Sequence, residues 1–95
     1  MTQVKDISRQ MRESYKDANF NAKIINAWEY NDVQIILYTL RVLDSKFYIV
    51  AKRVNGNEYP LSISTDPCTA LKKAGRWDKV TEQIANSECQ GLSPG

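Results

Sequence analysis

The 95-residue chain contains no histidine, so it lacks the commonest general base and the commonest metal ligand of proteins. No serine–histidine or cysteine–histidine nucleophilic pair can therefore form within it. Glycine is also scarce, and the four glycines, Gly56, Gly75, Gly91 and Gly95, are too far apart to form a phosphate-binding loop. We expect a protein that is not an enzyme and that holds no cofactor and no metal.

Cysteine is nearly absent, and no long apolar run is present. Cys68 and Cys89 are too few for a disulfide scaffold and lack the close spacing of zinc ligands, so the simplest interpretation is two reduced thiols. No segment approaches the roughly 20 apolar residues of a membrane helix. Residues 1–18 mix basic and acidic side chains without the apolar stretch of a secretory signal. The sequence thus predicts a soluble, cytoplasmic protein with no membrane partner.

The composition is typical of one folded domain, which we place at residues 1–95, with residues 90–95 as a frayed end. Hydrophobic residues make up 42% of the chain and charged residues 25%, as in ordinary globular proteins. Thirteen basic and eleven acidic residues give a net charge of +2. This charge is too small to indicate by itself a nucleic acid or an anionic membrane as the partner.

Hydrophobic periodicity predicts one helix near each end of the chain. The first covers residues 3–18, and its apolar stripe consists of Val4, Ile7, Met11, Tyr15 and Ala18. The second covers residues 67–88, after the capping residue Asp66. Its stripe consists of Ala70, Leu71, Ala74, Trp77, Val80, Thr81, Ile84 and Ala85. This helix either continues through Gly75 or breaks there, because glycine weakens a helix interior.

Between the helices the chain is rich in β-branched and aromatic residues, interrupted by three polar pairs suited to two-residue hairpin turns. The pairs are Asn31-Asp32, Asp44-Ser45 and Asn55-Gly56. They divide the segment into four strands, at about residues 20–30, 33–43, 46–54 and 57–63. The predicted fold class is therefore α+β, with an N-terminal helix, a four-stranded antiparallel β-meander and a C-terminal helix.

These turns also predict a strand register, in which directly opposed residues share one face of the sheet. The opposed pairs include Trp28 with Ile35, Thr39 with Val50, Tyr48 with Ile63, and Arg53 with Glu58. One face then collects most of the large apolar side chains and is the predicted core. Its members include Ile24, Trp28, Ile35, Leu37, Tyr48, Val50, Leu61 and Ile63.

The opposite face is also apolar at its centre, although a sheet with one face in water should alternate cleanly. The residues predicted to bind a partner there are Ile36, Tyr38, Leu40, Phe47 and Ile49. If both helices cover the core face, this patch is exposed and requires a partner. If one helix packs on each face, the patch is buried within the chain. Both arrangements fit the sequence.

The function that fits best is a small non-enzymatic interaction module. It would act as a regulator, inhibitor or accessory subunit that binds another protein or forms a homodimer through this apolar face. The alternative is nucleic-acid binding through a basic face of the C-terminal helix, where the chain carries Lys72, Lys73, Arg76 and Lys79. Acidic neighbours dilute the positive field of that face, which makes it the second choice.

Overall fold

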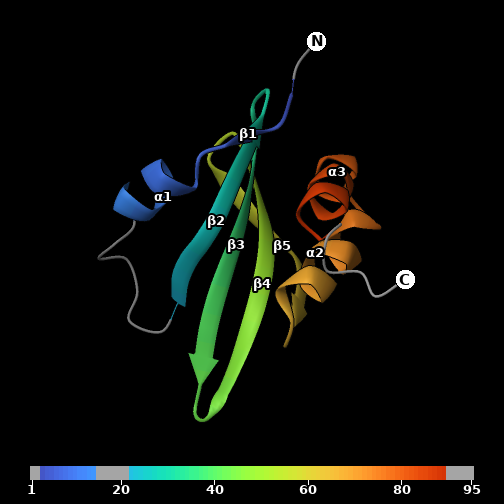
Figure 1. The fold of residues 1–95 in the computed structure, drawn as a ribbon. Helices are drawn as coiled ribbons and strands as arrows, with labels where there is room; N and C mark the ends of the chain where they lie inside the picture. Colours follow the sequence, from blue (N-terminus) through green and yellow to red (C-terminus); the bar gives the residue numbers. More distant parts are fainter. Residues whose placement is uncertain (1–2, 15–21, 90–95) are drawn as a thin grey trace.

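The structure is a computed structural model that describes residues 3–14 and 22–89. It is an α+β fold with one antiparallel sheet, whose strands lie side by side in chain order (Figure 1). The strands are β1 (Lys5–Asp6), β2 (Ala22–Tyr30), β3 (Val33–Val42), β4 (Ser45–Val54) and β5 (Asn57–Ser64). The helices are α1 (Ser8–Ser14), α2 (Pro67–Gly75) and α3 (Lys79–Glu88). The sheet has five strands rather than the predicted four, because β1 adds to the edge of β2.

The N-terminal helix begins at Ser8, later than the predicted start at residue 3. Lys5 and Asp6 pair with β2 instead of joining the helix. Asp6 then accepts a hydrogen bond from the backbone N–H of Ser8 at 2.8 Å, a local turn that precedes the first helical residues. The predicted stripe positions Tyr15 and Ala18 lie outside the described residues.

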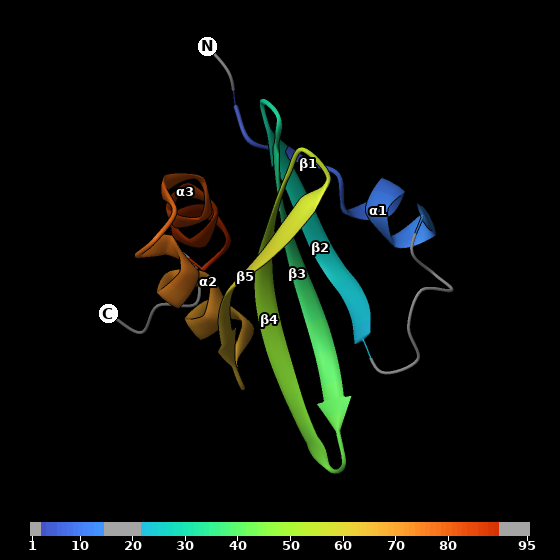
Figure 2. The ribbon, with the colours of Figure 1, turned by 180° about the vertical axis from the view of Figure 1, so that it is seen from behind.

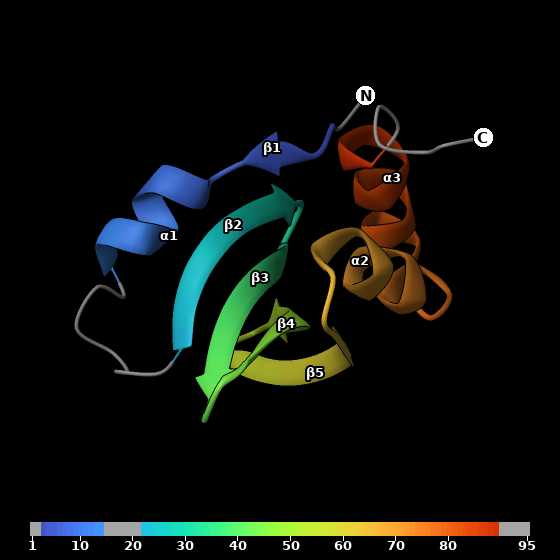
Figure 3. The ribbon, with the colours of Figure 1, turned by 60° about the horizontal axis from the view of Figure 1, so that its bottom comes forward.

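Helices cover both faces of the sheet, so the arrangement with one helical layer on each face is the one adopted (Figure 3). The core beneath α2 and α3 consists of Trp28, Ile35, Leu37, Val50, Ala70, Leu71, Ala74, Ile84, Ala85 and Cys89. The core beneath α1 is much smaller and consists of Ile7, Met11, Ala27 and Ile36. We call these two faces the α2/α3 face and the α1 face.

The predicted register holds at the first hairpin, where Trp28 opposes Ile35. It fails towards the start of β2, because an irregularity between Ile24 and Asn26 shifts the pairing. Such a bulge reverses the faces of the residues beyond it. Ile24, predicted on the core face with Trp28, therefore packs against the cluster beneath α1.

The predicted turn between β3 and β4 was wrong by one residue. The turn residues are Leu43 and Asp44, and Thr39 therefore opposes Tyr48 rather than Val50. This error moves each partner by two positions along the opposite strand. The assignment of these two strands to faces is unchanged, since side chains alternate with a period of two.

The last hairpin turns at Asn55-Gly56, and Arg53 opposes Glu58 as predicted. A second irregularity follows in β5. Val50 opposes Ser62 but Ala51 opposes Pro60, so the residue between these partners is unpaired. Ile63 therefore opposes Ile49 rather than Tyr48, and it lies on the α1 face instead of the predicted core face.

The C-terminal helical segment breaks after Gly75, one of the two outcomes that the sequence left open. A Cβ atom at position 75 would lie 2.9 Å from the Cα atom of Glu82, which is too close for any other residue without movement of the backbone. Glycine thus permits the end of α2 to approach the first turn of α3. Asp66 caps α2 as predicted, accepting a hydrogen bond from the Thr69 N–H at 2.9 Å.

The prediction of reduced thiols was wrong, because Cys68 and Cys89 form a disulfide with their Cα atoms 5.7 Å apart. The bond joins the first turn of α2 to the residue that follows α3. The helix break brings the two cysteines together, since a continuous helix over residues 67–88 would hold them roughly 30 Å apart. Within residues 3–14 and 22–89, no helix is long and apolar enough to span a membrane.

Candidate partner-binding surface

The five residues predicted to bind a partner lie on the α1 face, but they do not share one environment. Ile36 is fully buried in the cluster beneath α1 and cannot touch a partner directly. Tyr38 packs at the margin of that cluster, and its hydroxyl donates to the Glu58 carboxylate at 3.0 Å. Leu40, Phe47 and Ile49 are half-buried and belong to neither core cluster of the described residues.

The hairpin formed by β3 and β4 projects beyond the rest of the sheet (Figure 2). Among the described residues, the pairing of β2 with β3 reaches Leu40, and the pairing of β5 with β4 reaches Tyr48. Within the same part of the chain, residues 41–46 form ladder pairs only with each other. A projecting hairpin can enter a recess on another molecule without moving the body of the fold.

The two faces of the projecting hairpin differ in chemistry. On the α1 face, Leu40 opposes Phe47, and the neighbouring Val42 is 47% exposed. On the other face Arg41 directly opposes Lys46, and both are exposed. Like charges in that position destabilise a hairpin by several tenths of a kcal/mol up to about 1 kcal/mol. The hairpin tip is thus apolar on one side and cationic on the other.

Leu43, the first turn residue of this hairpin, is unusual both in its backbone conformation and in the exposure of its apolar side chain. Its φ of 55° places it in the left-handed region, which costs a leucine about 1–2 kcal/mol. Its side chain is 92% exposed, so it contributes little to the core. The equivalent positions of the other two hairpins hold Asn31 and Asn55, and asparagine tolerates this conformation well.

We call the apolar residues of this region the hairpin patch. Its members are Leu40, Val42, Leu43, Phe47, Ile49 and Ile63. The exposed edge of the patch comprises Val42, Leu43 and the 49%-exposed Ile63. Sequence reasoning missed Leu43 because the polar pair Asp44-Ser45 was the better turn signal. It missed Ile63 because it did not use Pro60, which lies beside the bulge in β5 and which strands tolerate mainly at edges and bulges.

The residues of the predicted nucleic-acid site all lie at or next to the corner between α2 and α3, and all are exposed. Lys72 and Lys73 occupy the last turn of α2, and Lys73 also donates to the Ile63 carbonyl at 3.0 Å. Arg76 follows α2 directly, and Lys79 is the first residue of α3. The structure therefore brings this set together in one short stretch of surface.

Trp77 lies within the same corner and is 79% exposed, although helical periodicity placed it on the buried stripe. The prediction failed because α2 ends at Gly75, so Trp77 is no longer in phase with the core residues of α2. A continuous helix would have turned its side chain towards the sheet.

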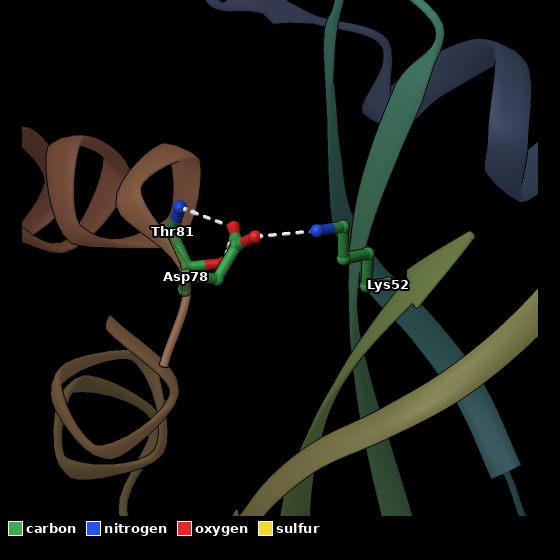
Figure 4. A network of polar contacts seen from close by, with 3 residues as sticks. All are labelled: Lys52, Asp78 and Thr81. Atoms are coloured by element: carbon green, nitrogen blue, oxygen red, sulfur yellow. Dashed lines mark hydrogen bonds and ion pairs between the residues drawn. The ribbon is translucent and has the colours of Figure 1, made fainter. Parts of the chain in front are cut away.

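A buried polar network fixes the corner to the sheet (Figure 4). Asp78 caps α3 by accepting from the Thr81 N–H at 3.0 Å and the Thr81 hydroxyl at 2.9 Å. Its other oxygen pairs with the Lys52 ammonium of β4 at 2.8 Å. Burial raises the pKa of Asp78, but the hydrogen bonds from Lys52 and Thr81 outweigh it and lower the pKa below its ordinary value.

The described ranges, 3–14 and 22–89, contain no group of three Cys, Asp or Glu side chains suited to a metal ion. A scan against protein-family models, a search of curated proteins and a search of solved structures each found no match to this chain.

Proposed function

We propose that the protein is a non-enzymatic interaction module that binds another protein through the hairpin patch. In this role it acts as a regulator, inhibitor or accessory subunit. The observation that carries the proposal is Leu43, which adopts a strained backbone conformation with its side chain almost wholly in water. A residue that breaks local rules without an evident gain in the folded chain is the kind expected at a functional site.

Binding to a partner would bury the apolar side chains of Val42 and Leu43, which remain exposed in the folded chain. Full burial of a leucine or valine side chain contributes about 1.5–3 kcal/mol. Val42 and Leu43 together could therefore provide a small apolar anchor, with the half-buried Leu40 and Phe47 around it. Anchors of this kind account for most of the affinity in many protein interfaces.

The charges at the hairpin tip define the chemistry of the partner. Arg41 and Lys46 lie on the opposite side of the hairpin from Leu40, Val42 and Phe47, so a recess that receives the tip would meet both the cations and the apolar side chains. We expect a recess with an apolar floor and acidic residues on its rim. A second copy of the chain fits less well, since a symmetric contact between two tips would bring their cations together.

Site-specific photo-crosslinking tests this proposal. A photoreactive amino acid is placed at position 43, and at Asp32 of the opposite hairpin turn as the matched control, in cells of the natural source. We expect one protein to be captured from position 43 and not from position 32. That protein is then purified, and its binding to the wild type and to Leu43→Asn is measured by calorimetry.

The asparagine variant should bind at least roughly tenfold more weakly, the loss expected for one buried leucine. Equal affinity of the two chains would refute the role of the patch. Light scattering on the purified chain provides a second check. A dimer that dissociates in Leu43→Asn would show that a second copy, not a different protein, occupies the patch.

The cytoplasmic location expected from the sequence stays a prediction, and the disulfide supports a different compartment. Cytosolic reductants keep most thiols reduced, whereas secreted and periplasmic proteins retain their disulfides. Maleimide labelling of protein quenched directly in its natural source decides between these locations. Labelling of both Cys68 and Cys89 would support the cytoplasm, and protection of both would support an oxidising compartment.

A further inference from the structure

Trp77 is the more exposed of the two tryptophans by a wide margin, at 79% against 4% for Trp28. The backbone on either side of it is fixed. Gly75 lies against the backbone of Glu82, and Asp78 is buried and paired with Lys52. The indole therefore projects from a rigid corner, at the cost of leaving a large apolar surface in water.

Four cations surround this indole in the sequence, at positions 72, 73, 76 and 79. Lys72 and Arg76 lie one helical turn apart, and Lys73 lies three residues before Arg76, so their side chains share one side of α2. None of the four forms an ion pair with another described residue. Asp78, the acidic residue within this stretch, is already paired with Lys52, whereas the exposed Glu82 lies against Gly75 in the first turn of α3. The four cations outweigh this one acidic side chain, so the corner keeps a local charge of about +3.

Helix electrostatics explain only part of this charge. Lys72 and Lys73 lie near the C-terminus of α2, where the helix dipole stabilises cations. Lys79, however, is the first residue of α3, where the dipole disfavours a cation. Neither effect accounts for the exposure of Trp77 beside them.

We infer that this corner binds single-stranded nucleic acid, with Trp77 stacking on an unpaired base while Lys72, Lys73, Arg76 and Lys79 neutralise the neighbouring phosphates. An aromatic platform next to a positive surface is the arrangement by which proteins hold single strands without reading their sequence. Bases inside a duplex are stacked on one another, so a lone indole favours an unpaired strand. The inference is independent of the hairpin patch, whose residues belong to β3, β4, β5 and the turn between β3 and β4.

Fluorescence anisotropy with a labelled 12-nucleotide oligo(dT) or oligo(U), at 20 mM salt and upwards, tests the inference. We expect binding that weakens with salt, with a log–log slope of about −3 if all four cations contact phosphates. Binding should also quench the emission of Trp77. Trp77→Ala should weaken binding roughly 5- to 100-fold, the usual loss for one base–aromatic stack.

Two charge reversals separate a local site from the general field of the protein. Lys72→Glu and Lys23→Glu change the net charge by the same amount, but Lys23 lies on β2, away from the corner. We expect Lys72→Glu to weaken binding at least tenfold and Lys23→Glu to have little effect. Circular dichroism and thermal melting should show that each variant folds.

The inference would be overturned by the absence of binding at 20 mM salt, by equal effects of the two charge reversals, or by unchanged affinity in Trp77→Ala. Competition by polyglutamate as strong as that by the oligonucleotide would also overturn it, because the corner would then be a site for an acidic protein segment. The crosslinking test of the hairpin patch is unaffected by any of these outcomes.

Discussion

Lys52 on β4 and Asp78 at the start of α3 form an ion pair of 2.8 Å between the sheet and the helical layer. The Asp78 side chain is only 7% exposed, and it also caps α3. Asp78→Ala would remove the cap and leave the Lys52 ammonium without its partner. We expect the free energy of unfolding to fall by about 2–3 kcal/mol, measured by urea denaturation.

A loss below about 0.5 kcal/mol would contradict this role, since it would match an ordinary surface substitution. Lys52→Met is the matched control for the charge. It retains the cap but leaves the Asp78 carboxylate unpaired, and it should cost less because Thr81 still donates two hydrogen bonds to that carboxylate.

The same pair makes stability depend on pH in the acid range. Burial raises the pKa of Asp78, but the hydrogen bonds from Lys52 and Thr81 lower it by more than burial raises it. The folded-state pKa therefore lies below the ordinary 3.8. The folded state therefore holds the proton less tightly than the unfolded chain. The stabilisation is present above about pH 4 and is lost as the pH falls through the folded-state pKa.

Urea denaturation at several pH values between about 2 and 6 measures this dependence. The decline of stability towards low pH should be shallower in Asp78→Asn than in the wild type. Asp6 also has a lowered pKa, because of its hydrogen bonds with Ser8, so some decline should remain in the variant. Identical pH profiles would show that Asp78 does not titrate with folding.

Leu43→Asn should stabilise the isolated protein while weakening its binding. Asparagine adopts the left-handed conformation of this turn at lower cost than leucine, so we expect a gain of about 1 kcal/mol in the free energy of unfolding. Thermal unfolding measures it. The reverse change at the equivalent position, Asn31→Leu, should lower stability by a similar amount. A stability loss in Leu43→Asn would indicate that the leucine packs within the chain.

The sequence predicted the fold class because three hairpin turns and two helical stripes leave few ways to bury the apolar residues. Asn55-Gly56 is a strong local signal and fixed its hairpin correctly. The bulge near Ile24 has no proline or glycine beside it to indicate it, whereas the bulge in β5 lies next to Pro60, a signal that the predicted register did not use. Leu43 was also not predicted as a turn residue. The turn lies at Leu43-Asp44, one residue before the predicted pair Asp44-Ser45, and both choices connect the same two long strands.

The candidate surfaces could be predicted only in part, and for the same reason. The placement of Leu40, Phe47 and Ile49 on one face of the sheet followed from the alternation of side chains along a strand alone. The burial of Ile36 depends on where α1 packs, and the exposure of Trp77 depends on the break at Gly75. Both are tertiary effects that local periodicity does not contain.

Thr39 carries a buried hydroxyl with no hydrogen-bond partner among the described residues. A buried polar atom without a partner costs about 1–3 kcal/mol, and valine has nearly the same shape and favours strands. We therefore expect Thr39→Val to raise the free energy of unfolding by about 1 kcal/mol. Thr39→Ser, which retains the hydroxyl and removes the methyl group, should lower it. A destabilised valine variant would indicate that the hydroxyl has a bound water or another partner in solution.

The Cys68–Cys89 bond closes a loop with a sequence separation of 21 around both C-terminal helices. Closing a loop of this length removes unfolded-state entropy equivalent to about 3 kcal/mol. The double variant Cys68→Ala/Cys89→Ala should lose about this amount, measured by urea denaturation without reductant. Dithiothreitol should destabilise the wild type to a similar extent and leave the double variant unchanged. If the reductant altered neither protein, the bond would be absent in solution, and α3 would be held to the sheet by Asp78 and the buried face around Ile84 alone.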